Sequence, residues 1–472
     1  MSVRGVILGA SALAAVAGAA VAAAPANTLP PPADQTLARE ILKEQIAINT
    51  VEPRGSTVAA EALARRFRAG GFSGGDVQVL APADKPHKGN LVVRLKGSGK
   101  ARPVLWICHL DVVEALPEDW TLPPFELTEN EGWLYGRGTA DVKGECSAMA
   151  TALIRLRREG HVPDRDIVAA FTADEETGDA NGVDFLLKTH RPLVDAEYVM
   201  NPDGGGGAMR GGKPVFYAVQ TSEKIYLTFQ LETTNKGGHS SVPPKENAIV
   251  RLTEGMGRLA KYEYPLHLTA TTRGYFRAMA AFETGQKKAD MLAVAADTPD
   301  PAAAARLAVD PVVNAQLRTT CVFTGVSGGH AENALPQRAR AVYQCRMMPG
   351  ETAEEVQAQA VKAIADPQIA VTVINPANPT PESPPQPRIM EAVEASVRSI
   401  HPGLPVTPYM DLGASDGVYT RGAGIPTYAV GSIFGDIDDV RAHGRDERIG
   451  VDQFNQGVEL TYRLMKATST AR

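Results

Sequence analysis

The chain has 472 residues, of which 44% are hydrophobic and 22% are charged. This balance is typical of a soluble globular protein and excludes a disordered chain, a collagen-like fibre and a multi-span membrane protein. The 48 basic and 54 acidic residues give a net charge of −6, so we expect no nucleic-acid partner. Four cysteines are too few for a disulfide scaffold. At about 150 residues per domain, the length predicts two or three domains.

The N-terminal segment has the pattern of a secretory signal. Arg4 precedes a run of small and apolar residues from 6 to 23, and Pro25 lies between Ala24 and Ala26. Because proline hinders cleavage just before it, a cut after Ala26 is favoured over one after Ala24. The alternative is an uncleaved anchor, which the weakly apolar Ala/Gly composition disfavours. We expect an exported protein, periplasmic or secreted, with no membrane contact beyond this segment.

Strand and helix patterns alternate in the first half of the chain. The elements expected there are a helix at 37–46, strands at 90–95, 104–108, 166–172 and 198–201, and a helix that ends at Gly160. Alternation of this kind predicts a mostly parallel α/β sheet.

The pattern changes near Phe216, where strands and helices no longer alternate. Strands are expected at 225–231, 319–324 and 338–346, and helices at 247–259, 275–309 and 353–365. A proline-rich linker at 376–387 leads to a helix at 389–400, a strand at 427–430 and a helix at 452–466. We therefore predict a catalytic domain formed by 27–218 and 376–472, interrupted by an α+β domain at 219–375, with 1–26 as the signal peptide.

The cysteines are permitted to pair in an exported protein. A hairpin that turns near Asn333 would place Cys321 opposite Cys345, so these two form either a disulfide or a pair of buried free thiols. Cys108 and Cys146 each lie close to a candidate metal ligand.

Five clusters place metal-competent side chains after apolar segments, and the carboxyl edge of a parallel sheet is where such folds bind ligands. Each cluster taken singly has an ordinary interpretation, such as a core histidine, a helix cap or a solvated loop. Together they supply two histidines and three carboxylates, a set that suits two zinc ions with one bridging carboxylate. The candidate ligands are His109, which Asp111 could orient, Asp141, one of the adjacent Glu175 and Glu176, Asp203, and His443.

These clusters, in this order, resemble those of the di-zinc aminoacylase/carboxypeptidase family (peptidase family M20), over nearly the whole chain from 37 to 465. The resemblance implies two Zn²⁺ ions, replaceable by Co²⁺ or Mn²⁺, in a zinc-hydrolase domain. One ion would be held by His109, Asp141 and Asp203, and the other by Asp141, Glu176 and His443. Glu175 would be the general base for a metal-bridging hydroxide, and Asp111 would orient His109.

The inserted region also carries residues that resemble the family's pattern. His239, in Gly237–Pro243, resembles a histidine that reaches the partner's active site across a homodimer, which makes the insertion a dimerisation (lid) domain. Asn333 and Arg346 resemble substrate-binding residues, and Gly413 and Ser415 lie in a segment that resembles a glycine-rich substrate loop. Without the resemblance, a loop histidine and a structural ion pair would be the simpler interpretations of His239 and Arg346.

Two departures from the family pattern are present. Val142 occupies a position that often holds Asp in a cis peptide, and Ile225 replaces Gly in a Glu-Lys-Gly strand. The added length at 262–320 resembles the carboxypeptidase S-like branch, which includes N-acyl-amino-acid hydrolases.

We therefore expect a hydrolase that cleaves the amide of small peptides or N-acyl amino acids with a free carboxylate. The alternatives are a dipeptidase or aminopeptidase that recognises a free amino terminus, and a non-catalytic binding protein on the same fold.

Overall fold

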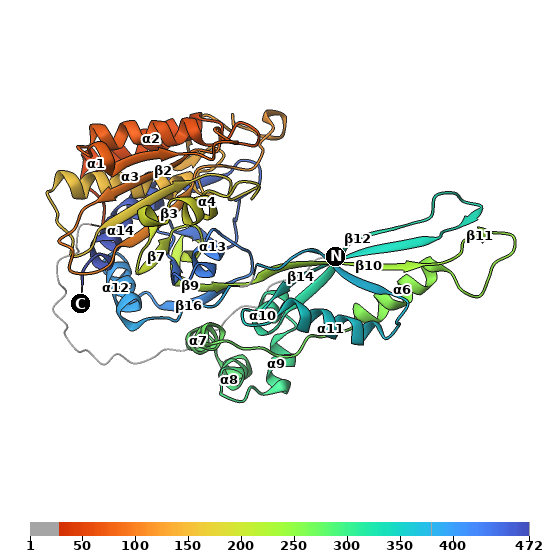
Figure 1. The fold of residues 1–472 in the computed structure, drawn as a ribbon. Helices are drawn as coiled ribbons and strands as arrows, with labels where there is room; N and C mark the ends of the chain where they lie inside the picture. The colour runs from red at the N-terminus through yellow and green to blue at the C-terminus, as the bar shows by residue number, and fades with distance from the viewer. Residues whose placement is uncertain (1–27, 379, 472) are drawn as a thin grey trace.

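The computed structural model describes residues 28–378 and 380–471. A rounded body carries a long arm, which extends to the right in Figure 1. The predicted signal at 1–26 lies outside the described residues. In the part of the chain that is described, no helix combines the length and the apolar character needed to cross a membrane.

A ten-stranded sheet forms the centre of the body. β6, β3, β7 and β17 run parallel to one another, and antiparallel strands extend the sheet on both sides. In sheet order the strands are β1 (Val77–Leu80), β2 (Asn90–Leu95), β6 (Ile167–Thr172), β3 (Val104–His109), β7 (Tyr198–Asn201), β17 (Thr427–Ala429), β9 (Lys213–Glu223), β8 (Gly206–Arg210) and β18 (Gly435–Asp436), with β16 (Val406–Asp411) paired to β9. The prediction of an α/β fold with a large, mostly parallel sheet is confirmed.

Helices cover both faces of this sheet, which explains why every residue of β3 and β6 is buried. One face packs against α1 (Pro32–Ala47), α2 (Thr57–Ala69), α3 (Lys143–Arg158), α12 (Pro387–Arg398) and α14 (Val451–Thr468). The other packs against α4 (Gly182–Thr189), α5 (Arg191–Val194) and α13 (Gly417–Gly422). A separate small sheet contains β4 (Thr128–Asn130), β5 (Trp133–Tyr135) and β19 (Arg448–Gly450).

The arm contains a four-stranded antiparallel sheet. Side chains of β10 alternate between the two faces, and Leu227, Phe229 and Leu231 face a core formed with two helices. The strands, in sheet order, are β12 (Thr320–Gly328), β14 (Arg338–Met347), β10 (Ile225–Thr234) and β15 (Ala370–Asn375), and the helices are α6 (Ala248–Leu259) and α11 (Ala353–Ile364). At the far end of the arm, β11 (Gly238–His239) pairs with β13 (Ala334–Leu335) (Figure 1).

A cluster of short helices lies where the arm meets the body (Figure 1). They are α7 (Ala270–Met279), α8 (Gly285–Val294), α9 (Pro301–Leu307) and α10 (Pro311–Leu317), and they have their own apolar core. The predicted helical stretch 275–309 is thus divided, because Gly285 has a φ of 59° and Pro301 starts a new helix. The side chain of Gln316 donates a hydrogen bond of 2.8 Å to the backbone of Met410 in β16, so this cluster is attached to the body.

Both cysteine pairs form disulfides. Cys321 and Cys345 are directly opposite each other in the β12–β14 pair, so of the two alternatives left open by the sequence the structure has the disulfide. The second bond joins Cys108 in β3 to Cys146 in α3.

Candidate metal centre

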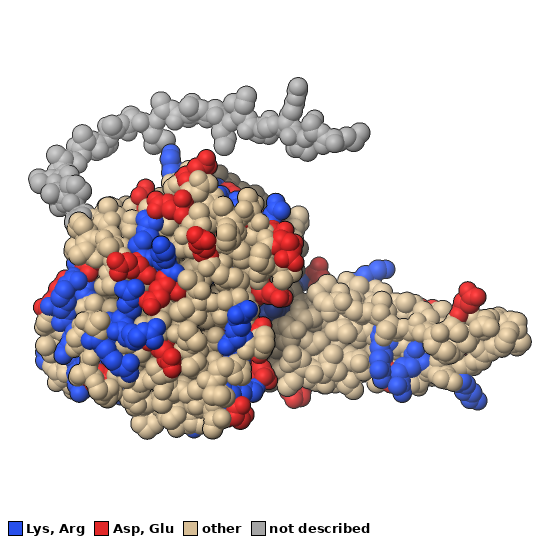
Figure 2. All heavy atoms as spheres, turned by 90° about the horizontal axis from the view of Figure 1, so that it is seen from above, with Lys and Arg blue, Asp and Glu red and all other residues tan. Residues whose placement is uncertain are grey.

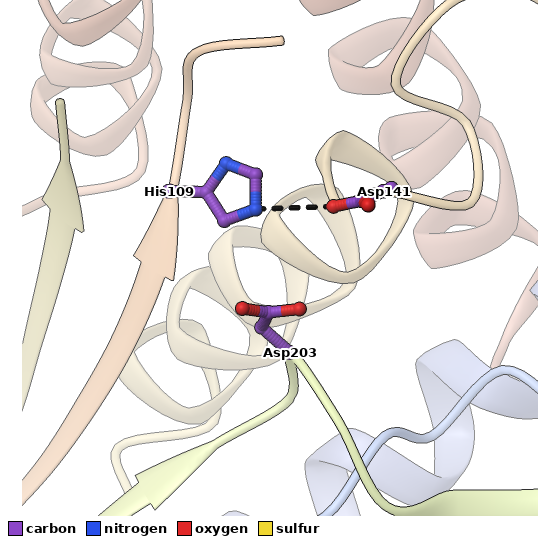
Figure 3. A group of neighbouring side chains, drawn as sticks. All are labelled: His109, Asp141 and Asp203. Carbon is purple, nitrogen blue, oxygen red and sulfur yellow. Dashed lines mark hydrogen bonds and ion pairs between the residues drawn. The ribbon is translucent and has the colours of Figure 1, made fainter. Parts of the chain in front are cut away.

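The first group of candidate ligands contains His109, Asp141 and Asp203. β3 ends at His109, whose Nε2 lies 3.1 Å from Oδ1 of Asp141. Asp203 follows β7, and its carboxylate points toward the same space (Figure 3). One ligand atom from each of the three residues lies within 4.8 Å of the others. The ends of β3 and β7 and the turn before α3 thus bring together residues that are far apart in the sequence.

The second group contains Asp141, Glu176 and His443. Oδ2 of Asp141 lies 3.0 Å from Nε2 of His443, and the Glu176 carboxylate lies 3.1 Å from the same nitrogen. The two oxygens of Asp141 therefore face two different histidines, one in each group. This arrangement is the one that a carboxylate bridging two cations requires. Asp141 reaches it from the turn before α3, and the peptide bond between Asp141 and Val142 is cis.

Asp111 contacts both the imidazole and the segment that carries the two glutamates. Its backbone oxygen lies 3.1 Å from Nδ1 of His109, whereas its carboxylate is 3.7 Å away. The carboxylate oxygens instead accept hydrogen bonds from the backbone N–H groups of Glu175, at 3.1 Å, and Glu176, at 3.0 Å. Asp111 thus holds the turn of the glutamates, a contact that its position two residues after His109 does not reveal.

A buried ion pair supports the same turn from the other side. Asp174 has a left-handed φ of 66°, and its carboxylate pairs with Lys88 and accepts hydrogen bonds from Thr177 and Ala180. Lys88 also pairs with Glu52. Asp174 directly precedes Glu175 and Glu176 in the sequence, but no local signal relates Lys88 to it.

The titration properties of the cluster indicate an excess of negative charge. Burial raises the pKa of Glu175 to about 10 and that of Asp203 to about 8. The hydrogen bond with Asp141 raises the pKa of His443 to about 9. Protons are therefore held on groups that normally lose them near neutral pH, since carboxylates placed close together need a cation or a proton. Two nitrogen ligands and several carboxylates form a suitable donor set for divalent zinc, cobalt or manganese.

The predicted substrate loop lies beside this cluster. Gly413 donates its N–H to Asp411 at 2.8 Å, and the hydroxyl of Ser415 donates to the buried carboxylate of Glu223 at 3.0 Å. Asp416, which the sequence did not single out, accepts hydrogen bonds from Asn181 at 2.5 Å and Thr172 at 3.1 Å. Burial raises the pKa of Asp416 to about 6.

Three predicted residues are not brought to the metal cluster within one chain. His239 is exposed in β11. The backbone oxygen of Asn333 accepts a hydrogen bond of 3.0 Å from the backbone N–H of Ser240, the residue after His239. His239 and Asn333 both belong to the segment around β11 and β13, which lies at the far end of the arm (Figure 1). Arg346 lies on β14 opposite Tyr226, with its guanidinium 4.8 Å from the ring centre.

The disulfide next to His109 leads to a first prediction. Cys108 precedes this residue, and Cys146 lies in the first turns of α3 after Asp141. Replacing both cysteines by alanine should weaken Zn²⁺ binding, by about 10-fold or more, because the two ligand-bearing segments are no longer cross-linked. Competition with a chromophoric chelator measures this affinity.

The disulfide of the arm supplies the matched control. Removing either bond should lower the stability by about 2–4 kcal/mol, but the Cys321→Ala/Cys345→Ala variant should bind Zn²⁺ as the wild type does. An equal loss of affinity in both variants would contradict a local effect at the metal centre.

Comparison with known proteins places the chain in a family. The model for Peptidase family M20/M25/M40 matches residues 105–467. The chain belongs to this family. It is therefore a hydrolase of peptide or other amide bonds, as the sequence predicts.

The relatives that the chain resembles are also named as hydrolases or peptidases. The chain is 28% identical over 395 residues to the N-fatty-acyl-amino acid synthase/hydrolase PM20D1 of Xenopus tropicalis, covering 78% of this chain and 73% of the relative. It is 27% identical over 412 residues to the probable carboxypeptidase S-like 2 of Dictyostelium discoideum, covering 80% and 74%. Among solved structures, the M20 family metallo-carboxypeptidase Sso-CP2 of Sulfolobus solfataricus has the same fold, with a TM-score of 0.65, 18% identity and coverage of 92% and 99%.

Proposed function

We propose that the chain is an exported di-zinc hydrolase that cleaves the amide of small peptides or N-acyl amino acids with a free carboxylate. The observation that carries the proposal is the position of Asp141, with one oxygen toward His109 and the other toward His443. Two divalent cations bound there would polarise the scissile carbonyl and provide a nucleophilic water. His109, Asp141 and Asp203 would hold one of them, and Asp141, Glu176 and His443 the other.

Glu175 is the residue that we assign to proton transfer. It lies beside His109 and Glu176 in the same cluster, and the backbone bond to Asp111 fixes its turn. Its carboxylate would accept the proton of the attacking water and return it to the leaving amine, which is general acid–base catalysis. Burial raises the pKa of Glu175 in the metal-free site. Two bound cations would lower this pKa again, which would leave the carboxylate ionised and able to accept the proton.

The names of the relatives support the substrate class. PM20D1 is named for N-fatty-acyl amino acids and the Dictyostelium protein as a probable carboxypeptidase, and both names imply a substrate with a free carboxylate. We assign Asn333 and Arg346 to substrate binding, because a guanidinium can hold a carboxylate with two hydrogen bonds. Gly413 and Ser415 lie in the loop next to the metal cluster, and we assign this loop to substrate binding as well.

We further propose that two chains form a homodimer through their arms. On the face seen in Figure 2, charged side chains are sparser on the arm than on the body. The edge strand β12 exposes Val322 and Val326, at 57% and 67%, and the other edge strand exposes Ile374, at 50%. Exposed apolar residues on edge strands favour association with another chain. In a dimer, His239 of one chain would reach the metal cluster of the other and would donate a hydrogen bond to the oxyanion that develops on the scissile carbonyl.

Export is supported by two separate features. The N-terminal sequence has the pattern of a secretory signal, and all four cysteines are in disulfides, which persist in oxidising compartments. We propose a periplasmic or secreted location.

A hydrolysis screen tests the proposed reaction. N-acetyl and N-acyl amino acids, free dipeptides and C-terminally amidated dipeptides are compared with and without a chelator. We expect cleavage of substrates with a free carboxylate, including those with a blocked amino terminus, and loss of cleavage with chelator. Cleavage restricted to substrates with a free amino group would instead favour a dipeptidase, and the absence of any cleavage after zinc addition would favour a binding protein.

A further inference from the structure

Glu447 is a buried glutamate that lies four residues after His443. It has no exposed surface, and it directly precedes β19. Its backbone oxygen accepts a hydrogen bond of 3.0 Å from Gly136, which continues the pairing between β19 and β5. The residue therefore joins the segment of His443 to the segment that leads to Asp141.

The carboxylate of Glu447 accepts four hydrogen bonds. Oε1 accepts from the backbone N–H of Ala140 at 2.8 Å and from that of Asp141 at 3.0 Å. Oε2 accepts from the backbone N–H of Gly138 at 3.0 Å and from Arg137 Nη1 at 2.6 Å. A carboxylate has about four acceptor sites, so all of them are used. One side chain thus binds four of the five residues at 137–141, and Thr139 is the exception.

Arg137 extends this network back to His443. Its guanidinium is almost fully buried, stacks over Trp120 at 5.0 Å and donates to the backbone oxygen of His443 at 3.4 Å. His443 has a left-handed φ of 62°, and its side chain is 55% exposed. Since few packing contacts hold an exposed side chain, this residue depends on its backbone for its position.

We infer that Glu447, through Arg137, is a positioning residue for the metal centre. Its carboxylate fixes the backbone of Asp141, and the guanidinium fixes the backbone of His443. The two residues that meet at 3.0 Å in the second ligand group are therefore oriented by one buried ion pair. This inference rests on the proposed function, because it concerns the geometry of the same proposed ligands.

Glu447→Gln tests the inference with a nearly isosteric change. The amide nitrogen would face groups that are all donors and leave the Arg137 charge buried without its partner. We expect Zn²⁺ affinity to fall about 10–100-fold, the usual effect of changing a group that orients metal ligands. The affinity is measured by chelator competition on folded protein, together with the Tm of the metal-free form.

Glu145→Gln is the matched control. Glu145 is also a buried glutamate of the body, and it accepts backbone hydrogen bonds from Ser432 at 2.6 Å and Ile433 at 2.7 Å. Burial raises its pKa to about 8, so near neutral pH it is mostly uncharged and an amide resembles it. This variant should bind Zn²⁺ as the wild type does.

The outcomes separate the inference from the proposed function. A wild-type protein that binds no metal would overturn the proposed function, and the inference with it. A wild type that binds two ions, with unchanged affinity in folded Glu447→Gln, would overturn the inference alone. If Glu447→Gln does not fold, Arg137→Lys replaces it, since lysine keeps the charge but lacks the planar fork that donates to Glu447 and His443 from two separate nitrogens. Unchanged affinity in Arg137→Lys would then overturn the inference.

Discussion

Replacing Glu175 by alanine should reduce amide hydrolysis by about 10²–10⁴-fold, the usual contribution of a general acid–base group, while the metal stays bound. Activity and metal binding should separate because none of the proposed metal ligands is changed. His109, Asp141, Asp203, Glu176 and His443 are all retained, so each proposed cation keeps three protein ligands. Only the carboxylate assigned to proton transfer is removed.

The measurement combines steady-state rates on an N-acyl amino acid with the metal content of the same preparation. Glu118→Ala is the control, because Glu118 is exposed in the short helix η2 (Pro117–Asp119) on the same body. It should behave as the wild type. Retained activity in Glu175→Ala would exclude Glu175 as the base, and loss of metal together with activity would make it a ligand instead.

Replacing His239 by alanine should reduce kcat by about 10²–10³-fold, the usual effect of losing one hydrogen-bond donor to a developing oxyanion. The residue is far from the metal cluster of its own chain (Figure 1), so its effect depends on a second chain. Mixing His239→Ala with Glu175→Ala should therefore restore part of the activity. In a mixed dimer, one of the two sites has both Glu175 and a His239 from the partner chain.

The matched control for His239 is His330→Ala. His330 is an exposed histidine in the turn between β12 and β13, and its removal should leave activity unchanged. Recovery after mixing is measured as the rate at equal total protein, after exchange of subunits. Unchanged activity in His239→Ala, or a mixture that stays inactive, would contradict the proposed transfer of this residue between chains.

The sheet and most of the metal cluster could be predicted from local patterns. Continuous apolar runs marked β3 and β6, and polar residues at the ends of such strands marked His109 and Glu175. The antiparallel pair of the arm was indicated by alternation and by the equal spacing of Cys321 and Cys345 from Asn333. These features depend on neighbouring residues and on where strands of one sheet end.

The supporting residues could not be predicted, because their partners are distant in sequence. Lys88 meets Asp174, Cys108 meets Cys146, and Glu447 accepts hydrogen bonds from residues about 300 positions earlier. A glutamate after a histidine in a polar loop has the pattern of a solvated side chain. Only the packing of the small sheet beside α3 buries Glu447 and turns it toward Asp141.

The most direct test of the central claim is metal analysis of the purified protein, coupled to hydrolysis of an N-acyl amino acid. The wild type should contain two zinc ions per chain, lose hydrolysis when a chelator removes them and regain it when zinc is returned. Asp141→Ala should bind neither ion firmly, since both ligand groups include this residue. A wild-type protein that contains no metal and hydrolyses the same substrate at an unchanged rate in chelator would contradict the account.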